Sequence, residues 1–167
     1  MFGRWRKNEP AEAAAKGLAS LVRSHLPEAD GESVRVVTAI ASLLAAVAYA
    51  DRDFSPAEER RVRMELARIH GMTAGGVDAI LEVLRREIVH LTTVELPRST
   101  RTLLELGDDE LRLEVLGVLV EVAAADGEIT HSETTLLRQI TTSLGLTQDD
   151  YNRAQAAHRD KLSVLKA

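Results

Sequence analysis

The sequence contains no cysteine, and aromatic residues make up only 3% of its 167 positions. The lack of cysteine excludes disulfides, thiolate catalysis and cysteine-ligated zinc or iron–sulfur centres. Because 45% of the residues are nevertheless hydrophobic, the core must be built from Leu, Val, Ile and Ala. This composition favours packed helices over an all-β fold, and the length suffices for one compact domain or two small helical halves.

An excess of positive charge is also missing. The chain has 21 Lys and Arg against 26 Asp and Glu, so its net charge of −5 does not attract phosphates and we expect no nucleic acid partner. Residues 1–7 are basic, but no apolar stretch follows them, unlike in a secretory signal. The most apolar run, residues 36–50, falls short of the ~20 residues that cross a bilayer. We therefore expect a cytoplasmic protein with no transmembrane segment.

Apolar residues recur at three- to four-residue spacing along most of the chain, which predicts an all-α protein. Start and stop signals divide the chain into separate helices. Ser55-Pro-Ala-Glu58 predicts a helix start with a capping box, Thr73, Asp108 and Thr130 open further helices, and glycines 71 and 145 end two of them. Residues 92–107 contain Pro97 and a short apolar group, Leu103, Leu104 and Leu106, so we expect a loop and one short helix there. The pattern predicts a compact bundle of about seven or eight helices.

The segment that starts at Asp51 is repeated at Asp126, 75 positions later. Ala-Asp-Arg-Asp-Phe-Ser-Pro-Ala-Glu58 matches Ala-Asp-Gly-Glu-Ile-Thr-His-Ser-Glu133, and the apolar stripes that precede the two segments also correspond. We interpret this as two repeat units, about 33–91 and 108–166. Since one unit alone cannot bury its apolar helix, we expect the two to pack as a pseudo-twofold bundle. This gives a basic, flexible tail over residues 1–10 and one helical domain over 11–167.

The two motifs, followed by Leu-Gly-Leu-Thr147, resemble the tellurite-resistance TerB family and its TerB-like relatives over about residues 33–155. The resemblance implies a cytoplasmic, all-α bacterial protein linked to tellurite and other chemical stress, with related domains attached to J-domain co-chaperones. It implies no catalytic reaction. We therefore expect a non-catalytic module that acts through a protein partner, for which a membrane-associated stress complex is one option.

Six carboxylates recur at matched positions of the repeat. Glu58 and Glu133 are explained by the capping box. Asp51 and Asp126 follow the last turn of a helix, where the helix dipole repels a negative charge, so a positive group should lie beside them. The next helix N-terminus, an arginine such as Arg60, Arg63 or Arg138, or a divalent cation such as calcium or magnesium would serve. The candidate cation ligands are Asp51, Asp53, Glu58, Asp126, Glu128 and Glu133.

Two features of the loops bear on this site. The first copy has Arg52 where the second has Gly127, so a loop that needs a positive φ would be strained in the first copy. The alternative function is a metal-dependent enzyme that uses the carboxylates in a cleft between the repeats, with an open coordination position and a general base. A deep pocket would favour the enzyme, and glutamates folded onto their caps would favour the module.

Overall fold

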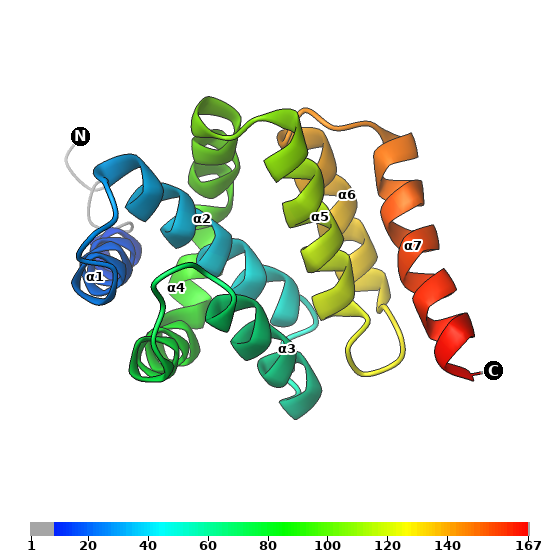
Figure 1. The fold of residues 1–167 in the computed structure, drawn as a ribbon, viewed down its shortest axis with the longest axis horizontal. Helices are drawn as coiled ribbons and strands as arrows, with labels where there is room; N and C mark the ends of the chain where they lie inside the picture. Colours follow the sequence, from blue (N-terminus) through cyan, green and yellow to red (C-terminus); the bar gives the residue numbers. More distant parts are fainter. Residues whose placement is uncertain (1–8, 167) are drawn as a thin grey trace, which may run out of the picture.

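The computed structural model describes the backbone of residues 9–166 and the side chains of residues 13–92 and 95–159. Over this part of the chain the protein consists of seven helices and no strand (Figure 1), which confirms the predicted all-α class. Residues 1–8 of the predicted basic tail lie outside the described residues. The helices are α1 (Glu9–His25), α2 (Gly31–Ala48), α3 (Pro56–Ala67), α4 (Ala74–Leu106), α5 (Asp109–Ala123), α6 (His131–Ser143) and α7 (Gln148–Lys166).

Side-chain caps start the helices where the sequence predicts them. At α3 the Ser55 hydroxyl accepts a hydrogen bond from the Glu58 N–H, while the Glu58 side chain accepts one from the Ser55 N–H. Thr130 and Glu133 form the same capping box at α6. The side chains of Thr73 and Asp108 cap α4 and α5. Two of the turns that follow helices use glycines with positive φ, Gly71 at 84° and Gly145 at 71°.

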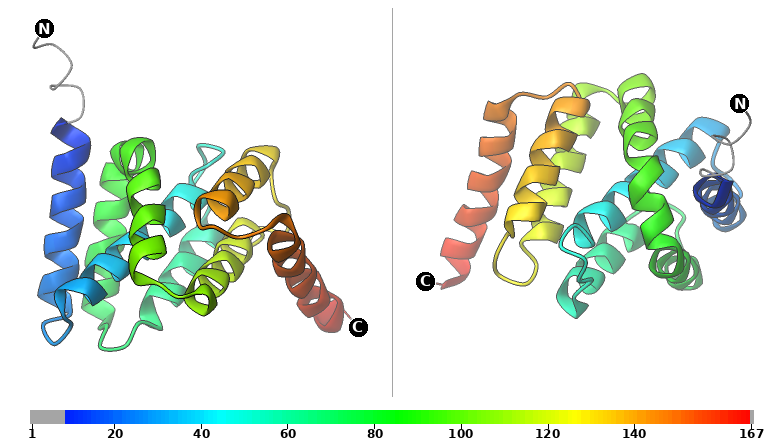
Figure 2. Two further views of the ribbon diagram at one scale, coloured as in Figure 1. Left: turned by 90° about the horizontal axis from the view of Figure 1, so that it is seen from above. Right: turned by 180° about the vertical axis from the view of Figure 1, so that it is seen from behind.

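The expected loop and short helix over residues 92–107 are wrong. α4 is one helix of 33 residues that contains Pro97, and Figure 2 shows that it bends along its length. A proline removes one helical hydrogen bond and bends the backbone, but it does not end a helix that is held on both sides. Leu91 and Leu103 are both buried, and α4 packs along α1 and α2. Tertiary packing therefore outweighs the local preference of proline.

α2 is the central helix, because it contacts α1, α3, α4, α5 and α6. It is long and apolar enough to cross a membrane by length and composition alone, but 56% of it is buried inside the fold. Burial of this kind is expected of a core helix that is apolar on all sides. α1 and α7 lie at opposite ends of the molecule (Figure 1).

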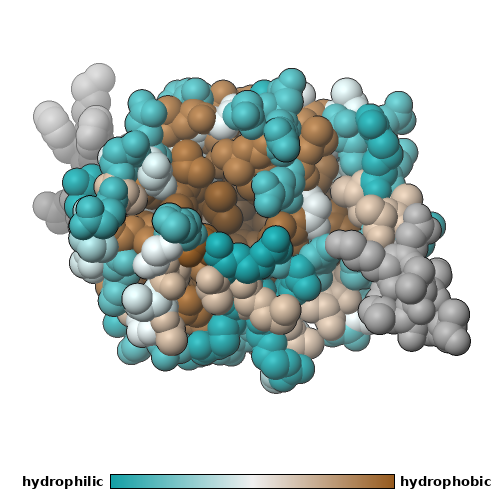
Figure 3. All heavy atoms as spheres, in the orientation of Figure 1, coloured by the Kyte–Doolittle hydropathy of each residue, from teal (hydrophilic) through white to brown (hydrophobic). Residues whose placement is uncertain are grey.

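A hollow with hydrophobic walls lies between α2, the end of α3 and α5. Its volume is about 190 Å³. We call it the α2–α5 groove; its hydrophobic lining residues are Ile40, Leu44, Ile69, Leu111, Val115 and Val118. Figure 3 shows hydrophobic side chains gathered around a hollow at the centre of the face over α2 and α5. Clustered apolar surface of this kind is typical of protein contacts.

Two adjacent glycines at the start of α4 provide a test of the packing between α1 and α4. A Cβ on Gly75 would meet nothing closer than 4.0 Å, whereas one on Gly76 would lie 3.2 Å from the His25 Cβ and 2.8 Å from the Met72 Sδ. We predict that Gly75→Ala raises the free energy of unfolding by about 0.5–1 kcal/mol, the difference in helix propensity. Gly76→Ala should not be stabilised in this way, because its new methyl group would press against His25 and displace the end of α1.

Urea unfolding of the two variants measures this difference directly. Equal stabilisation by both substitutions would contradict the close approach of His25 to the first turn of α4.

Candidate functional site

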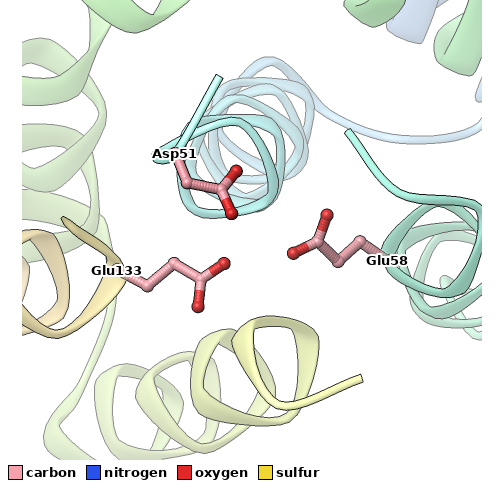
Figure 4. Close-up of side chains that lie close together, drawn as sticks. All are labelled: Asp51, Glu58 and Glu133. Atoms are coloured by element: carbon pink, nitrogen blue, oxygen red, sulfur yellow. The ribbon is translucent and has the colours of Figure 1, made fainter. Parts of the chain in front are cut away.

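Three of the six predicted carboxylates meet at one point (Figure 4). Asp51 comes from the loop after α2, Glu58 from the first turn of α3 and Glu133 from the first turn of α6. One carboxylate oxygen from each residue lies within 4.8 Å of the other two. Glu58 and Glu133 are 1% and 0% exposed, and Asp51 is half-buried. We call these three residues the acidic cluster.

The capping boxes fix how the two glutamates point. The Oε2 atom of Glu58 accepts a hydrogen bond from the Ser55 N–H at 2.9 Å, and that of Glu133 accepts one from the Thr130 N–H at 2.8 Å. The other oxygen of each side chain, Oε1, is buried and has no hydrogen-bond partner among the described residues. Unpaired buried polar atoms are rare and cost free energy. Each glutamate therefore completes a cap with one oxygen and leaves the other for a proton or a cation.

Burial raises the pKa values of both Glu58 and Glu133. Burial is the main cause that raises the pKa of Glu133 to about 7. The Thr130 N–H opposes this shift, while the Glu58 carboxyl group and the charges of Glu58 and Asp51 add to it. Burial also raises the pKa of Glu58, against the hydrogen bonds from Ser55. Two buried carboxylates at this distance resist simultaneous ionisation unless a positive charge joins them.

The two acidic loops share one turn. The Asp53 N–H donates to the Asp51 Oδ1 at 3.0 Å, and the Glu128 N–H donates to the Asp126 Oδ1 at 3.2 Å. The residue in the middle of each turn has a positive φ, 67° at Arg52 and 103° at Gly127. The strain predicted at Arg52 is therefore present, because side-chain-bearing residues seldom adopt this conformation.

The arginines expected beside the aspartates do not pair with them. Among the described residues, neither Asp51 nor Asp126 forms an ion pair; Arg63 pairs with Asp78, and Arg138 lies over the Tyr151 ring. The other three predicted ligands are exposed and lie outside the acidic cluster: Asp53, Asp126 and Glu128. The structure thus brings together one aspartate and both capping glutamates of the six.

An ion-pair network next to the caps was not expected from the sequence. Arg61 on α3 pairs with Glu121 on α5 and with Glu65, which also pairs with Arg68. The mixed charges of α3 look like a solvated helix face in the sequence. Glu65 is nevertheless 9% exposed. Glu58, Arg61 and Glu65 are spaced three and four residues apart, which places them on one helix face. This spacing is the sequence signal from which the network beside the acidic cluster could have been predicted.

A family model described as tellurite resistance protein TerB matches residues 37–156. The chain belongs to the TerB family. The match includes the whole acidic cluster and both acidic loops, and it excludes α1 (Glu9–His25). No curated protein and no solved structure gives a significant match.

Four hollows in the described part of the chain lie apart from the acidic cluster of this TerB protein, because none of them is lined by Asp51, Glu58 or Glu133. Both glutamates are folded onto their caps.

The strained turn at Arg52 yields a prediction for stability. Arg52→Gly should raise the free energy of unfolding by about 0.5–1 kcal/mol, because glycine adopts a positive φ freely and its greater freedom in the unfolded chain cancels only part of the gain. Gly127→Ala is the matched substitution in the second loop and should lower stability by about 1 kcal/mol. Urea unfolding measures both; a loss of stability in Arg52→Gly would contradict strain at this turn.

The raised pKa of Glu133 predicts how stability depends on pH without a cation. The folded state binds more protons than the unfolded state between the ordinary value of 4.5 and about 7. The free energy of unfolding should therefore fall as the pH rises through this range. Glu133→Gln, which keeps the cap acceptor and carries no charge, should flatten the slope.

This dependence is measured by urea unfolding in chelator-treated buffers across the same range of pH. Glu128→Gln serves as the control, because it removes an exposed carboxylate from the loop before α6 and should keep the slope. A wild-type free energy of unfolding that rises between these two pH values would contradict the raised pKa of Glu133.

Proposed function

We propose that this TerB protein is a non-catalytic module that binds a divalent cation, takes part in the bacterial response to tellurite and other chemical stress, and acts in the cytoplasm through contact with a protein partner. The cation site is supported by one observation: the buried Oε1 atoms of Glu58 and Glu133 lack hydrogen-bond partners among the described residues and lie beside Asp51. The family membership supports the stress role.

The ligand set suits a hard cation. All three groups are carboxylates, which Ca²⁺ and Mg²⁺ prefer to nitrogen or sulfur ligands. Ca²⁺ binds oxygens at about 2.3–2.6 Å and so spans ligand atoms up to about 5 Å apart, whereas Mg²⁺ at about 2.1 Å spans little more than about 4 Å. Because the three oxygens lie within 4.8 Å of one another, calcium is the better fit to this arrangement. Water and backbone carbonyls would complete its shell.

A bound cation would join parts of the chain that are far apart in sequence. Glu58 and Glu133 stand at the N-termini of α3 and α6, at matched positions of the two proposed repeat units. Without a cation, repulsion between the carboxylates opposes the packing of these helix ends; with one, the repulsion becomes attraction. We infer that cation binding would hold the two proposed units together in the pseudo-twofold arrangement that the sequence repeat predicts.

α3 offers a connection between the cation and a protein partner. Glu58 lies in its first turn, while Glu65 near its end, and Arg68 and Ile69 just beyond it, line the α2–α5 groove. The Arg61–Glu121 ion pair ties the middle of α3 to α5. Fixing the start of α3 would therefore also fix one wall of this apolar groove, which is the surface we propose for the partner.

The cation site is tested by titrating the metal-free chain with CaCl₂. A saturating concentration of about 100 times the dissociation constant should raise the free energy of unfolding by about 2.7 kcal/mol, and amide NMR signals of the α3 and α6 N-termini should shift. Glu133→Gln should lose both effects, while the control Glu128→Gln should keep them. MgCl₂ should bind more weakly than CaCl₂.

The same variants test the link to the partner. In affinity capture from a native bacterial lysate, the wild type should retain a partner protein in calcium and release it in chelator. Glu133→Gln should retain no more of this partner in calcium than the wild type retains in chelator. Absence of any stabilisation or NMR shift at millimolar calcium would contradict the cation site. Capture that is identical in all conditions would contradict the coupling through α3.

A further inference from the structure

A second, independent site lies at the other end of the molecule, where α1, α2 and α4 surround a hollow of about 510 Å³. Figure 2 shows α1 and α4 side by side, and α1, α2 and α4 are all in mutual contact. The volume falls in the range of small-molecule sites. Small side chains on α1 and α2 make the hollow possible, because Ala15, Ala19 and Ala39 form part of its wall.

The hollow is strongly basic although the chain is acidic overall. Among the residues whose side chains are described, four cations line it, Lys16 and Arg23 from α1, Arg35 from α2 and Arg98 from α4, against one carboxylate, that of Glu95. The net charge of the whole chain is −5. Positive charge concentrated in a concave surface strengthens the local electrostatic potential and attracts anions.

The ion pairs around the hollow do not neutralise all of its positive charge, so some of this charge is available to a ligand. Glu95 is 5% exposed and pairs with Arg98 at 3.2 Å, so its charge is already offset. Arg35 pairs with Glu105 at 3.4 Å, but both side chains are about half exposed, and such pairs contribute little. Lys16 and Arg23 form no ion pair with a described residue.

One hydroxyl in the same wall lacks a partner among the described residues. Ser99 is 3% exposed and lines the hollow, yet its hydroxyl makes no hydrogen bond to a described residue. The hydroxyls of Thr38 and Thr102, by contrast, donate to carbonyl groups of their own helices. Ser99 therefore holds a hydrogen-bond donor ready for a ligand inside the hollow.

We propose that this hollow, which we call the basic pocket, binds a small organic anion that carries phosphate groups. Guanidinium groups match the geometry of phosphate oxygens through paired hydrogen bonds, and a serine hydroxyl adds a further donor. No aromatic side chain among the described residues lines the pocket, so this part of its wall offers no ring on which a base could stack, and the ligand is recognised by its charge. Three of the four cations precede residue 37, so most of the positive charge of the pocket comes from outside the segment that matches the TerB family.

The test uses pyrophosphate as the probe, with the full chain in resin-treated, metal-free buffer, so that the acidic cluster takes no part. Calorimetry and amide NMR should detect binding with shifts confined to the three helices around the pocket. The double variant Lys16→Ala/Arg23→Ala should raise the dissociation constant about tenfold or more, since both side chains are exposed and the fold does not depend on them.

Two further variants separate a site from general electrostatics. Arg60→Ala/Arg101→Ala removes two exposed arginines outside the pocket and should change the dissociation constant less than about twofold. Ser99→Ala leaves the net charge unchanged and should still weaken binding about threefold to fivefold. Glu133→Gln should bind pyrophosphate as the wild type does, which keeps this site separate from the proposed cation site.

Several results would overturn the proposal. These are the absence of heat and shifts at about 10 mM pyrophosphate, equal weakening by the pocket and control double variants, or a Ser99→Ala variant that binds unchanged. Binding of an octaglutamate peptide in the pocket without binding of pyrophosphate would also overturn it, and would indicate an acidic protein segment as the ligand.

Discussion

The approach of two like-charged, buried side chains is the constraint on which the acidic cluster and its surroundings depend. Glu58 and Glu133 are almost completely inaccessible, and neither forms an ion pair among the described residues. Each is held by a backbone N–H of its own helix cap, so the glutamates cannot turn away without undoing the starts of α3 and α6. The caps thus force an unfavourable electrostatic contact between the two carboxylates, which a proton relieves and which the proposed cation would also relieve.

This arrangement removes a contrast that the sequence analysis drew between capping and cation binding. A carboxylate has two oxygens, and in both glutamates one oxygen caps the helix while the other points to the shared space. The capping box orients the ligand much as outer-shell hydrogen bonds orient the ligands of known metal sites. The exposed carboxylates at 53, 126 and 128 lack this support, and they lie outside the cluster.

The rest of the fold separates two surfaces of opposite character around the central helix α2. The α2–α5 groove is mainly apolar and is joined to the acidic cluster through α3, whereas the basic pocket depends on α1 and takes three of its four cations from outside the family match. α2 contributes to both surfaces because it is contacted by five of the other six helices.

The sequence by itself determined the helical class, the caps at Ser55, Thr73, Asp108 and Thr130, and the strained turn at Arg52, because each depends on groups a few residues apart. It also indicated the family and the carboxylates that recur. Only the tertiary structure decided that α4 continues through Pro97, because buried contacts on both sides hold the bend. Only the tertiary structure brought Glu58 and Glu133 together with Asp51 and left Asp126 exposed, because distances across 75 residues of chain are set by packing and not by local preference.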